Sequence, residues 1–219
     1  MSKKAATPMT PEAAYAGLSA SARAIELSEG VTVDDFHRML SNRSKISHFV
    51  FNRFYQRYIK PFEKVCPDYN SGFAQMAVCC LMIEAMESFR NGWGDTTTDA
   101  IDKNGKKLCG GDIFNLFFDR YDEFLKFRGL GKEFYKSIRC GILHQAESKN
   151  GWLISRDGEL LDLLTRTINS TIFRRRMKKC LQAYCDELKT VDETSDVWQN
   201  FKIKMTCVIQ NCVQGALKT

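Results

Sequence analysis

The chain has 219 residues, of which 44% are hydrophobic and 26% are charged, and its formal net charge is +6. Such a chain is typical of one globular domain or two small ones, and its composition excludes collagen-like and Pro-rich disordered proteins. The longest apolar stretch, Phe73 to Ile83, is too short to span a bilayer, and the N-terminal lysines precede no apolar block like that of a secretory signal. The sequence therefore predicts a cytoplasmic protein without a membrane span.

Nine cysteines in a chain without a signal peptide indicate reduced thiols rather than a disulfide framework. There is no Cys-x-x-Cys pair, and the histidines are only His37, His48 and His144. We therefore expect neither a zinc site nor another cofactor. The positive net charge is compatible with an anionic partner but does not demonstrate one.

Apolar spacing and cap residues predict helices from the N-terminus onward. The first spans residues 10–27, the next is capped by Thr32 with Asp35, and a third stops before Pro61. A turn-rich segment at residues 67–72 is the clearest break in the first half. We accordingly divide the chain into a helical extension, residues 1–66, and a helical domain, residues 67–219, which could also form one compact unit.

The second half continues the helical pattern. A long apolar helix over residues 73–90 ends at Asn91-Gly92, and a polar surface loop follows over residues 95–111. Further helices are predicted over residues 112–124, 132–147, 171–188 and 195–213.

Residues 152–161 break the pattern because two short strand-like runs flank Asp157-Gly158, a signal for a hairpin with a type I′ turn. The predicted fold class is therefore all-α, a helical bundle with one small β-hairpin near residues 152–161.

The helix over residues 132–147 holds the candidate chemistry. An apolar stripe on this helix packs inward, and Arg139 and His144 lie on its flanks. Five residues correspond to a rotation of about 140° on an ideal helix, so the two side chains do not share one face. Either a loosened turn at Gly141 or a second copy of the helix in a dimer would bring them together.

Arg and His suit metal-free RNA cleavage. An imidazole exchanges a proton near neutral pH, and a guanidinium is a permanent cation that fits phosphate oxygens. The imidazole would help a ribose 2′-OH attack the neighbouring phosphate while the guanidinium stabilises the developing charge. The structural alternative is that His144 favours the C-terminal end of the helix dipole and Arg139 is a solvated flank.

Four residues near this pair are candidate supporting groups: Glu147, Glu84, Tyr135 and Cys140. Glu147 could hydrogen-bond the imidazole of His144, or it could be a solvated residue at the helix end. Glu84, within the apolar helix, needs a partner if buried, and Arg139 is one candidate; a solvent-exposed boundary position is the alternative. Tyr135, one turn before Arg139, could fix the Arg139 side chain or simply pack.

Two further groups of basic residues add positive charge. Lys103, Lys106 and Lys107 lie in the polar loop, which could close over a substrate. The densest basic run could steer RNA electrostatically, although a solvated helix face is the favoured explanation. This run comprises Arg174, Arg175, Arg176, Lys178 and Lys179.

Residues 138–144, Ile-Arg-Cys-Gly-Ile-Leu-His, resemble the Arg-x4-His motif of the HEPN superfamily of small helical domains. The resemblance covers about residues 72–188, including the apolar helix before the motif and the hairpin and helix after it. It implies a homodimer with facing motif helices, in which Arg139 contacts phosphate and His144 is the acid or base. Members of this superfamily often cut RNA without a metal, in antiviral defence or as toxins with an antitoxin partner.

The chain also departs from the family pattern. Cys140 stands where the residue after the Arg is frequently Asn, and Ala146 stands where one subgroup has a Tyr that a partner enzyme modifies. A second hypothesis from the same residues is a non-catalytic helical module that binds a protein or nucleotide partner. A metal-dependent hydrolase is disfavoured by the few histidines and the lack of a carboxylate cluster at ligand spacing.

Overall fold

The computed structural model describes residues 11–64 and 69–216 of the chain. It is mostly helical, with 64% of residues in helices, and the predicted helical architecture is confirmed. Within the described residues the α-helices are α1 (Pro11–Ala16), α2 (Ala20–Arg23), α3 (Val33–Met39), α4 (Arg43–Phe54), α5 (Gly72–Asn91), α6 (Gly110–Arg120), α7 (Gly131–Phe134), α8 (Cys140–Gln145), α9 (Ser170–Thr190) and α10 (Asp196–Ala216). Short π-helical and 3-10 segments extend them, namely η1 (Tyr55–Ile59), η2 (Lys60–Phe62), η3 (Asp122–Phe127) and η4 (Tyr135–Arg139).

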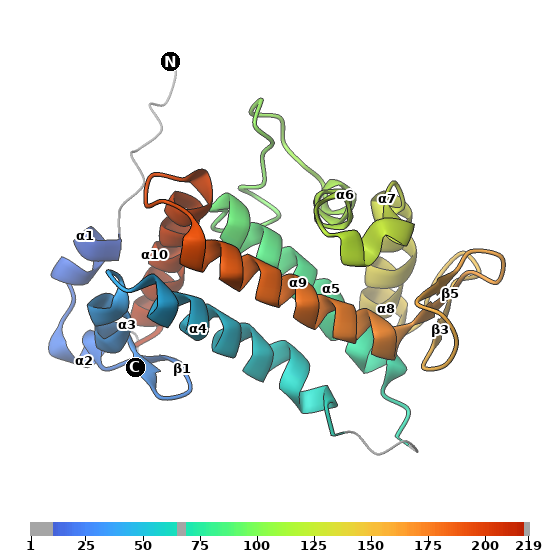
Figure 1. Cartoon of the computed structure of the whole chain (residues 1–219), viewed down its shortest axis with the longest axis horizontal. Helices are drawn as coiled ribbons and strands as arrows, with labels where there is room; N and C mark the ends of the chain where they lie inside the picture. Colours follow the sequence, from blue (N-terminus) through green and yellow to red (C-terminus); the bar gives the residue numbers. More distant parts are fainter. Residues whose placement is uncertain (1–10, 65–68, 217–219) are drawn as a thin grey trace.

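Helices α4, α5 and α9 form the centre of the molecule (Figure 1). Helix α9 packs against both α4 and α5, and α10 crosses one end of this layer against α5 and α1. The N-terminal helices therefore share their core with the rest of the chain, and one cluster of buried side chains extends from Ala22 to Val213. The predicted boundary between residues 66 and 67 lies outside the described residues.

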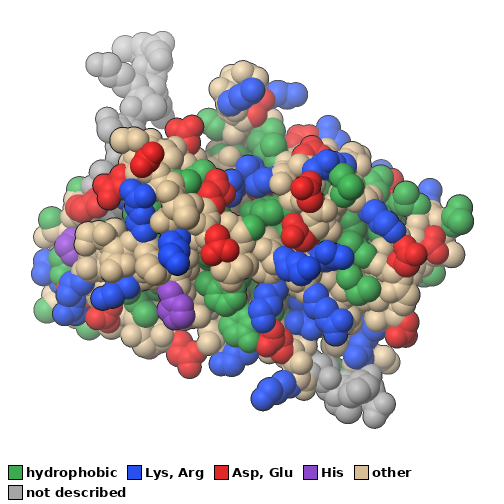
Figure 2. All heavy atoms as spheres, in the orientation of Figure 1, with side chains coloured by type: hydrophobic (Ala, Val, Ile, Leu, Met, Phe, Trp, Pro, Cys, Tyr) green, Lys and Arg blue, Asp and Glu red, His purple; other side chains and the backbone are tan. Residues whose placement is uncertain are grey.

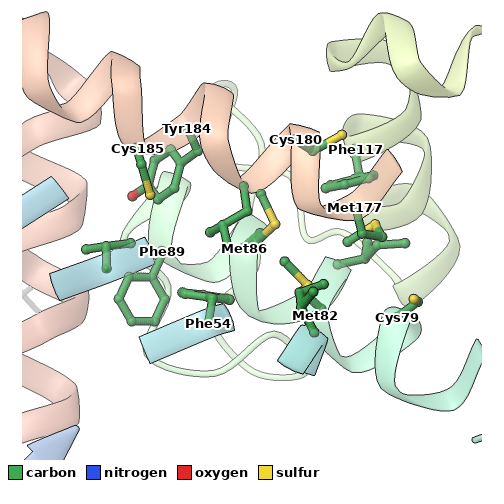
Figure 3. Close-up of a cluster of buried hydrophobic side chains, with 14 of the residues drawn as sticks. Phe54, Cys79, Met82, Met86, Phe89, Phe117, Met177, Cys180, Tyr184 and Cys185 are labelled. Carbon is green, nitrogen blue, oxygen red and sulfur yellow. The ribbon is translucent and has the colours of Figure 1, made fainter. Parts of the chain in front are cut away.

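The core has a mixed part and a phenylalanine-rich part. Between α4, α5 and α9 it combines buried aromatic and sulfur-containing side chains such as Phe54, Met86 and Tyr184 (Figure 3). Beside α6 it is a cluster of fully buried phenylalanines whose contacting rings lie 4.6 to 6.4 Å apart. Its members are Phe114, Phe117, Phe118, Phe124, Phe127, Phe134 and Phe173. Because Phe134 ends α7, this cluster anchors the start of the helix that carries Arg139.

Several predicted helix boundaries are confirmed by their capping geometry. Thr32 and Asp35 form the capping box of α3, and the Asn169 side chain accepts the N–H of Ile172 at the start of α9. Helix α5 ends at Gly92, whose φ of +71° is the left-handed conformation that glycine adopts most easily.

The single helix predicted over residues 10–27 is wrong. Helix α1 stops at Ala16, and Ser19 caps the separate helix α2 by accepting the N–H of Ala22. The chain then forms β1 (Glu26–Ser28), which pairs antiparallel with β2 (Val31–Thr32). The predicted helix is therefore two helices, because Ser19 lies within the apolar pattern and begins a new helix there.

The predicted hairpin at residues 152–161 is also wrong in its pairing. Strands β3 (Leu153–Ser155) and β4 (Leu161–Asp162) flank Asp157-Gly158 but do not pair with each other. Strand β5 (Thr167–Asn169) lies between them, parallel to β3 and antiparallel to β4. A type I′ turn needs positive φ at both central residues, and only Gly158 has it, at +82°.

Candidate functional site

The candidate motif lies on one continuous but irregular helix made of α7, η4 and α8. The π turn η4 ends at Arg139, and the chain that leaves α8 folds back onto it. The N–H of Lys149 donates to the carbonyl of Ser137 at 2.9 Å. Gly141 allows this return, because a Cβ at that position would lie 2.5 Å from the Glu147 carbonyl oxygen. Gly141 itself is helical, so it does not loosen the turn between Arg139 and His144.

Arg139 is fixed against α5 by Glu84. Its Nε donates to Glu84 Oε1 at 2.9 Å and its Nη2 donates to Glu84 Oε2 at 3.4 Å. The Arg139 and Glu84 side chains are 21% and 15% exposed, so the pair is largely shielded from water but still accessible to a ligand. Burial alone would lower the pKa of Arg139, yet the bond and the charge of Glu84 outweigh it and raise that pKa. Arg139 is therefore a fixed, permanently charged guanidinium.

Tyr135 supports the Arg139 side chain from one turn earlier. The Arg139 guanidinium lies 5.5 Å from the centroid of the Tyr135 ring, within cation–π range. Burial and the neighbouring Cys140, which hydrogen-bonds the Tyr135 hydroxyl, raise the pKa of Tyr135. The ring packs so closely on α6 that a Cβ at Gly110 would lie 2.2 Å from it.

Arg139 opens onto a cavity of about 470 Å³ between α5, η4 and the start of α6. The helical wall contains Glu84, Tyr135 and Arg139, with apolar Ile113 beside them. The rest of the lining comes from the predicted polar loop, which contributes Thr96, Thr97, Lys107, Leu108, Cys109 and Gly110. The loop thus lies against the candidate Arg, and this cavity is referred to below as the Arg139 pocket.

The structure does not bring Arg139 and His144 together within one chain. His144 is exposed, it does not line the Arg139 pocket, and no described residue makes a hydrogen bond or ion pair with its imidazole. Glu147 does not orient it, because Oε1 of Glu147 accepts the N–H and the hydroxyl of Ser148 instead. Helix α8 ends just beyond His144 at Ala146, whose φ is +52°.

One face of helix α5, beside the motif helix, is apolar and partly exposed to solvent. This α5 apolar face has helical spacing and consists of Ala74 and Leu81, which are exposed, and of Ala77, Val78 and Ala85, which are half-buried. Leu81 is 50% exposed, and Leu143, one turn after Arg139 on α8, is 59% exposed. By length and composition α5 could cross a membrane, but 56% of its most apolar window is buried, as in a core helix covered from one side.

The basic residues of the run on α9 differ in burial and in their partners. Arg174 is buried, donates from Nε to Gln75 Oε1 at 3.0 Å, and has its pKa lowered by burial. Lys178 pairs with Glu63 at 2.7 Å. Arg175 and Lys179 are exposed and Arg176 is half-buried. Figure 2 shows Lys and Arg side chains gathered over the N-terminal half of α9, with acidic side chains among them.

The Arg139–Glu84 pair is one of the two alternatives that the sequence offers for Glu84, because a buried carboxylate in an apolar helix needs a partner, and the structure contains it. The sequence does not predict that Thr96 and Lys107 line the same cavity as Arg139, because this placement depends on how the loop folds. Within residues 11–64 and 69–216, no group of three or more His, Cys, Asp or Glu side chains could hold a metal ion. Comparison with protein-family models, with curated proteins and with solved structures found no match for this chain.

Proposed function

We propose that this protein is a metal-independent endoribonuclease that acts as a homodimer. The observation that carries the proposal is the Arg139 pocket, in which a fixed guanidinium lines a cavity next to an uncovered apolar helix face. A cationic group held in a concave, partly dry site is what stabilisation of a phosphate transition state requires.

The proposed chemistry needs one proton acceptor and one permanent cation. The imidazole of His144 takes the proton of the ribose 2′-OH, whose oxygen attacks the adjacent phosphorus. The P–O5′ bond breaks, the His144 imidazolium formed in this way gives its proton to the leaving 5′-oxygen, and a 2′,3′-cyclic phosphate remains. Arg139 stabilises the extra negative charge on the phosphate oxygens during this step.

A second copy of the chain would complete the site. In one chain His144 is exposed and does not line the Arg139 pocket, so a His144 presented by a second molecule would complete the site. The α5 apolar face and Leu143 adjoin Arg139 and offer the hydrophobic surface that a stable dimer buries. Packing of two such faces about a twofold axis places both motif helices at one interface.

The proposal extends to the cellular setting. All described cysteines are free, which supports a reducing compartment such as the cytoplasm. A nuclease of this kind in antiviral defence or growth arrest would need a regulatory or antitoxin partner to hold it inactive. We propose such a partner on these grounds, and no membrane association.

The test is RNA cleavage by the purified protein in the presence of EDTA. We expect cleavage that leaves 2′,3′-cyclic phosphate ends, and losses of at least about 100-fold in Arg139→Ala and His144→Ala with unchanged circular dichroism. His48→Ala is the matched control, because His48 is remote from the pocket and bonds Asn52. Full activity in both motif variants would overturn the assignment and favour a non-catalytic binding module.

A further inference from the structure

The polar loop before α6 forms a rigid wall of the Arg139 pocket. Ile101 and Lys107 form an antiparallel bridge, and the N–H of Leu108 donates to the carbonyl of Ala100 at 2.9 Å. Ala100 is buried with Trp93 and Ile113 in a small apolar cluster of its own. The backbone that carries Lys107 is therefore held in place from both sides.

Lys107 is the cation of this wall, and it lines the same cavity as Arg139. Its side chain is exposed, and no described carboxylate or carbonyl pairs with its ammonium group. The hydroxyl of Thr96, on the same wall, likewise has no hydrogen-bond partner among the described residues. The neighbouring Thr97 differs, because its hydroxyl donates to Asp95.

The acidic groups around the pocket are already occupied. Both oxygens of Glu84 accept from Arg139. Asp112 accepts from the backbone and the thiol of Cys109 and pairs with Lys132 at 3.0 Å, so the start of α6 is neutralised internally. Two cations and one paired carboxylate line the cavity, which leaves a net positive charge for an anion.

We propose that Lys107 and the Thr96 hydroxyl bind the phosphate adjacent to the one that Arg139 contacts, so that one nucleotide of a single-stranded RNA occupies the pocket. This inference rests on the proposed ribonuclease function and names the form of its substrate. The cavity of about 470 Å³ falls within the size range of sites for small ligands, and Leu108 and Ile113 supply an apolar surface for a ribose or base. A nucleotide can enter such a cavity only if it is unpaired and unstacked.

The sequence offers a matched pair of variants for the test. Lys106 and Lys107 are neighbours on the same exposed loop, but only Lys107 lines the pocket. Binding is measured by fluorescence anisotropy with a labelled single-stranded RNA, in the His144→Ala background so that the probe stays intact. We expect Lys107→Ala to weaken binding about tenfold and to reduce the salt slope by about 1. Lys106→Ala should change neither quantity, Lys107→Arg should retain binding, and the same RNA annealed to its complement should be insensitive to Lys107.

Equal affinities for Lys107→Ala and Lys106→Ala, or no binding of the single strand, would overturn the subsite. Cleavage by the wild-type protein together with equal affinities would reject the subsite and leave the ribonuclease proposal standing. Binding that depends on Lys107, in a protein that cuts no RNA, would reject the ribonuclease and leave the subsite.

Discussion

Glu84 determines how the Arg139 guanidinium is presented to the pocket. The carboxylate occupies Nε and Nη2, which leaves the other terminal nitrogen, Nη1, without a bond to Glu84. This arrangement resembles the bidentate clamp by which carboxylates orient an Arg. The pair is therefore both an anchor for α5 against η4 and a positioning device for the charge.

We predict that Glu84→Gln lowers the free energy of unfolding by about 1–2 kcal/mol, because a partly buried guanidinium loses its charged partner. RNA cleavage should also fall, since Arg139 is no longer held by two charge-assisted bonds. Urea unfolding measures the first effect. Glu159→Gln is the control, because Glu159 also pairs with a cation, Lys126 at 2.7 Å, but is 74% exposed. Equal stability of the two variants would contradict the anchoring role of Glu84.

At this scale the sequence predicts contacts that the chemistry of a side chain demands better than contacts that the path of a loop creates. A carboxylate in an apolar helix and a tyrosine one turn before an arginine led to the contacts of Glu84 and Tyr135 with Arg139, which the structure contains. Lys107 could not be placed near Arg139, because that proximity depends on the bridge between Ile101 and Lys107 and on burial of Ala100. Glu147 turned to Ser148 because a nearer donor was available after α8 ended.

The contact between α6 and η4 is the element-scale feature on which the pocket depends. Helix α6 begins with Gly110 against the ring of Tyr135, and that ring in turn lies under Arg139. Helix packing this close leaves no volume for a methyl group, so the geometry of the pocket is sensitive to a residue that performs no chemistry.

We predict that Gly110→Ala lowers the free energy of unfolding by about 1–3 kcal/mol, because the new methyl group displaces the Tyr135 ring. RNA binding should weaken as well, since Arg139 loses its aromatic support. The comparison is with Gly17→Ala, where nothing lies within 4 Å of the added Cβ and we expect a change of less than about 0.5 kcal/mol. Thermal unfolding of the two variants side by side would refute this account if their midpoints coincide.

Element boundaries were predictable where a capping residue or a glycine marks them, as at Thr32, Asn169 and Gly92. Strand pairing was not, because β5 enters between β3 and β4 from a later part of the chain. The turn at Asp157-Gly158 could not reveal this, since a strong local turn signal does not specify which strands become neighbours. Strand β4 has only two residues, too few for an alternating hydrophobic pattern, and it forms because β5 pairs with it.

At the scale of the whole molecule, the partly exposed α5 apolar face is a hydrophobic surface that a bundle with all its apolar helix faces buried would not have. One side of α5 packs on α9 and α10, while the other leaves Leu81 half-exposed beside Arg139. Exposed leucines occur elsewhere, and Leu164 in the loop between β4 and β5 is 97% exposed. The α5 face, together with Leu143, adjoins the candidate site, so assembly through this surface would also affect function.

The central claim is that Arg139 of one copy and His144 of another serve one site, and complementation measures it most directly. Arg139→Ala and His144→Ala chains carrying different tags are co-expressed, the mixed dimer is isolated, and its RNA cleavage is compared with that of each parent. We predict that both parents are inactive and that the mixed dimer cleaves RNA, because one intact Arg139 and one intact His144 meet across the interface. Adding Leu81→Asp to both chains should abolish the recovery, whereas Leu164→Asp should not. A mixed dimer as inactive as its parents, or a fully active wild-type monomer, would contradict the account.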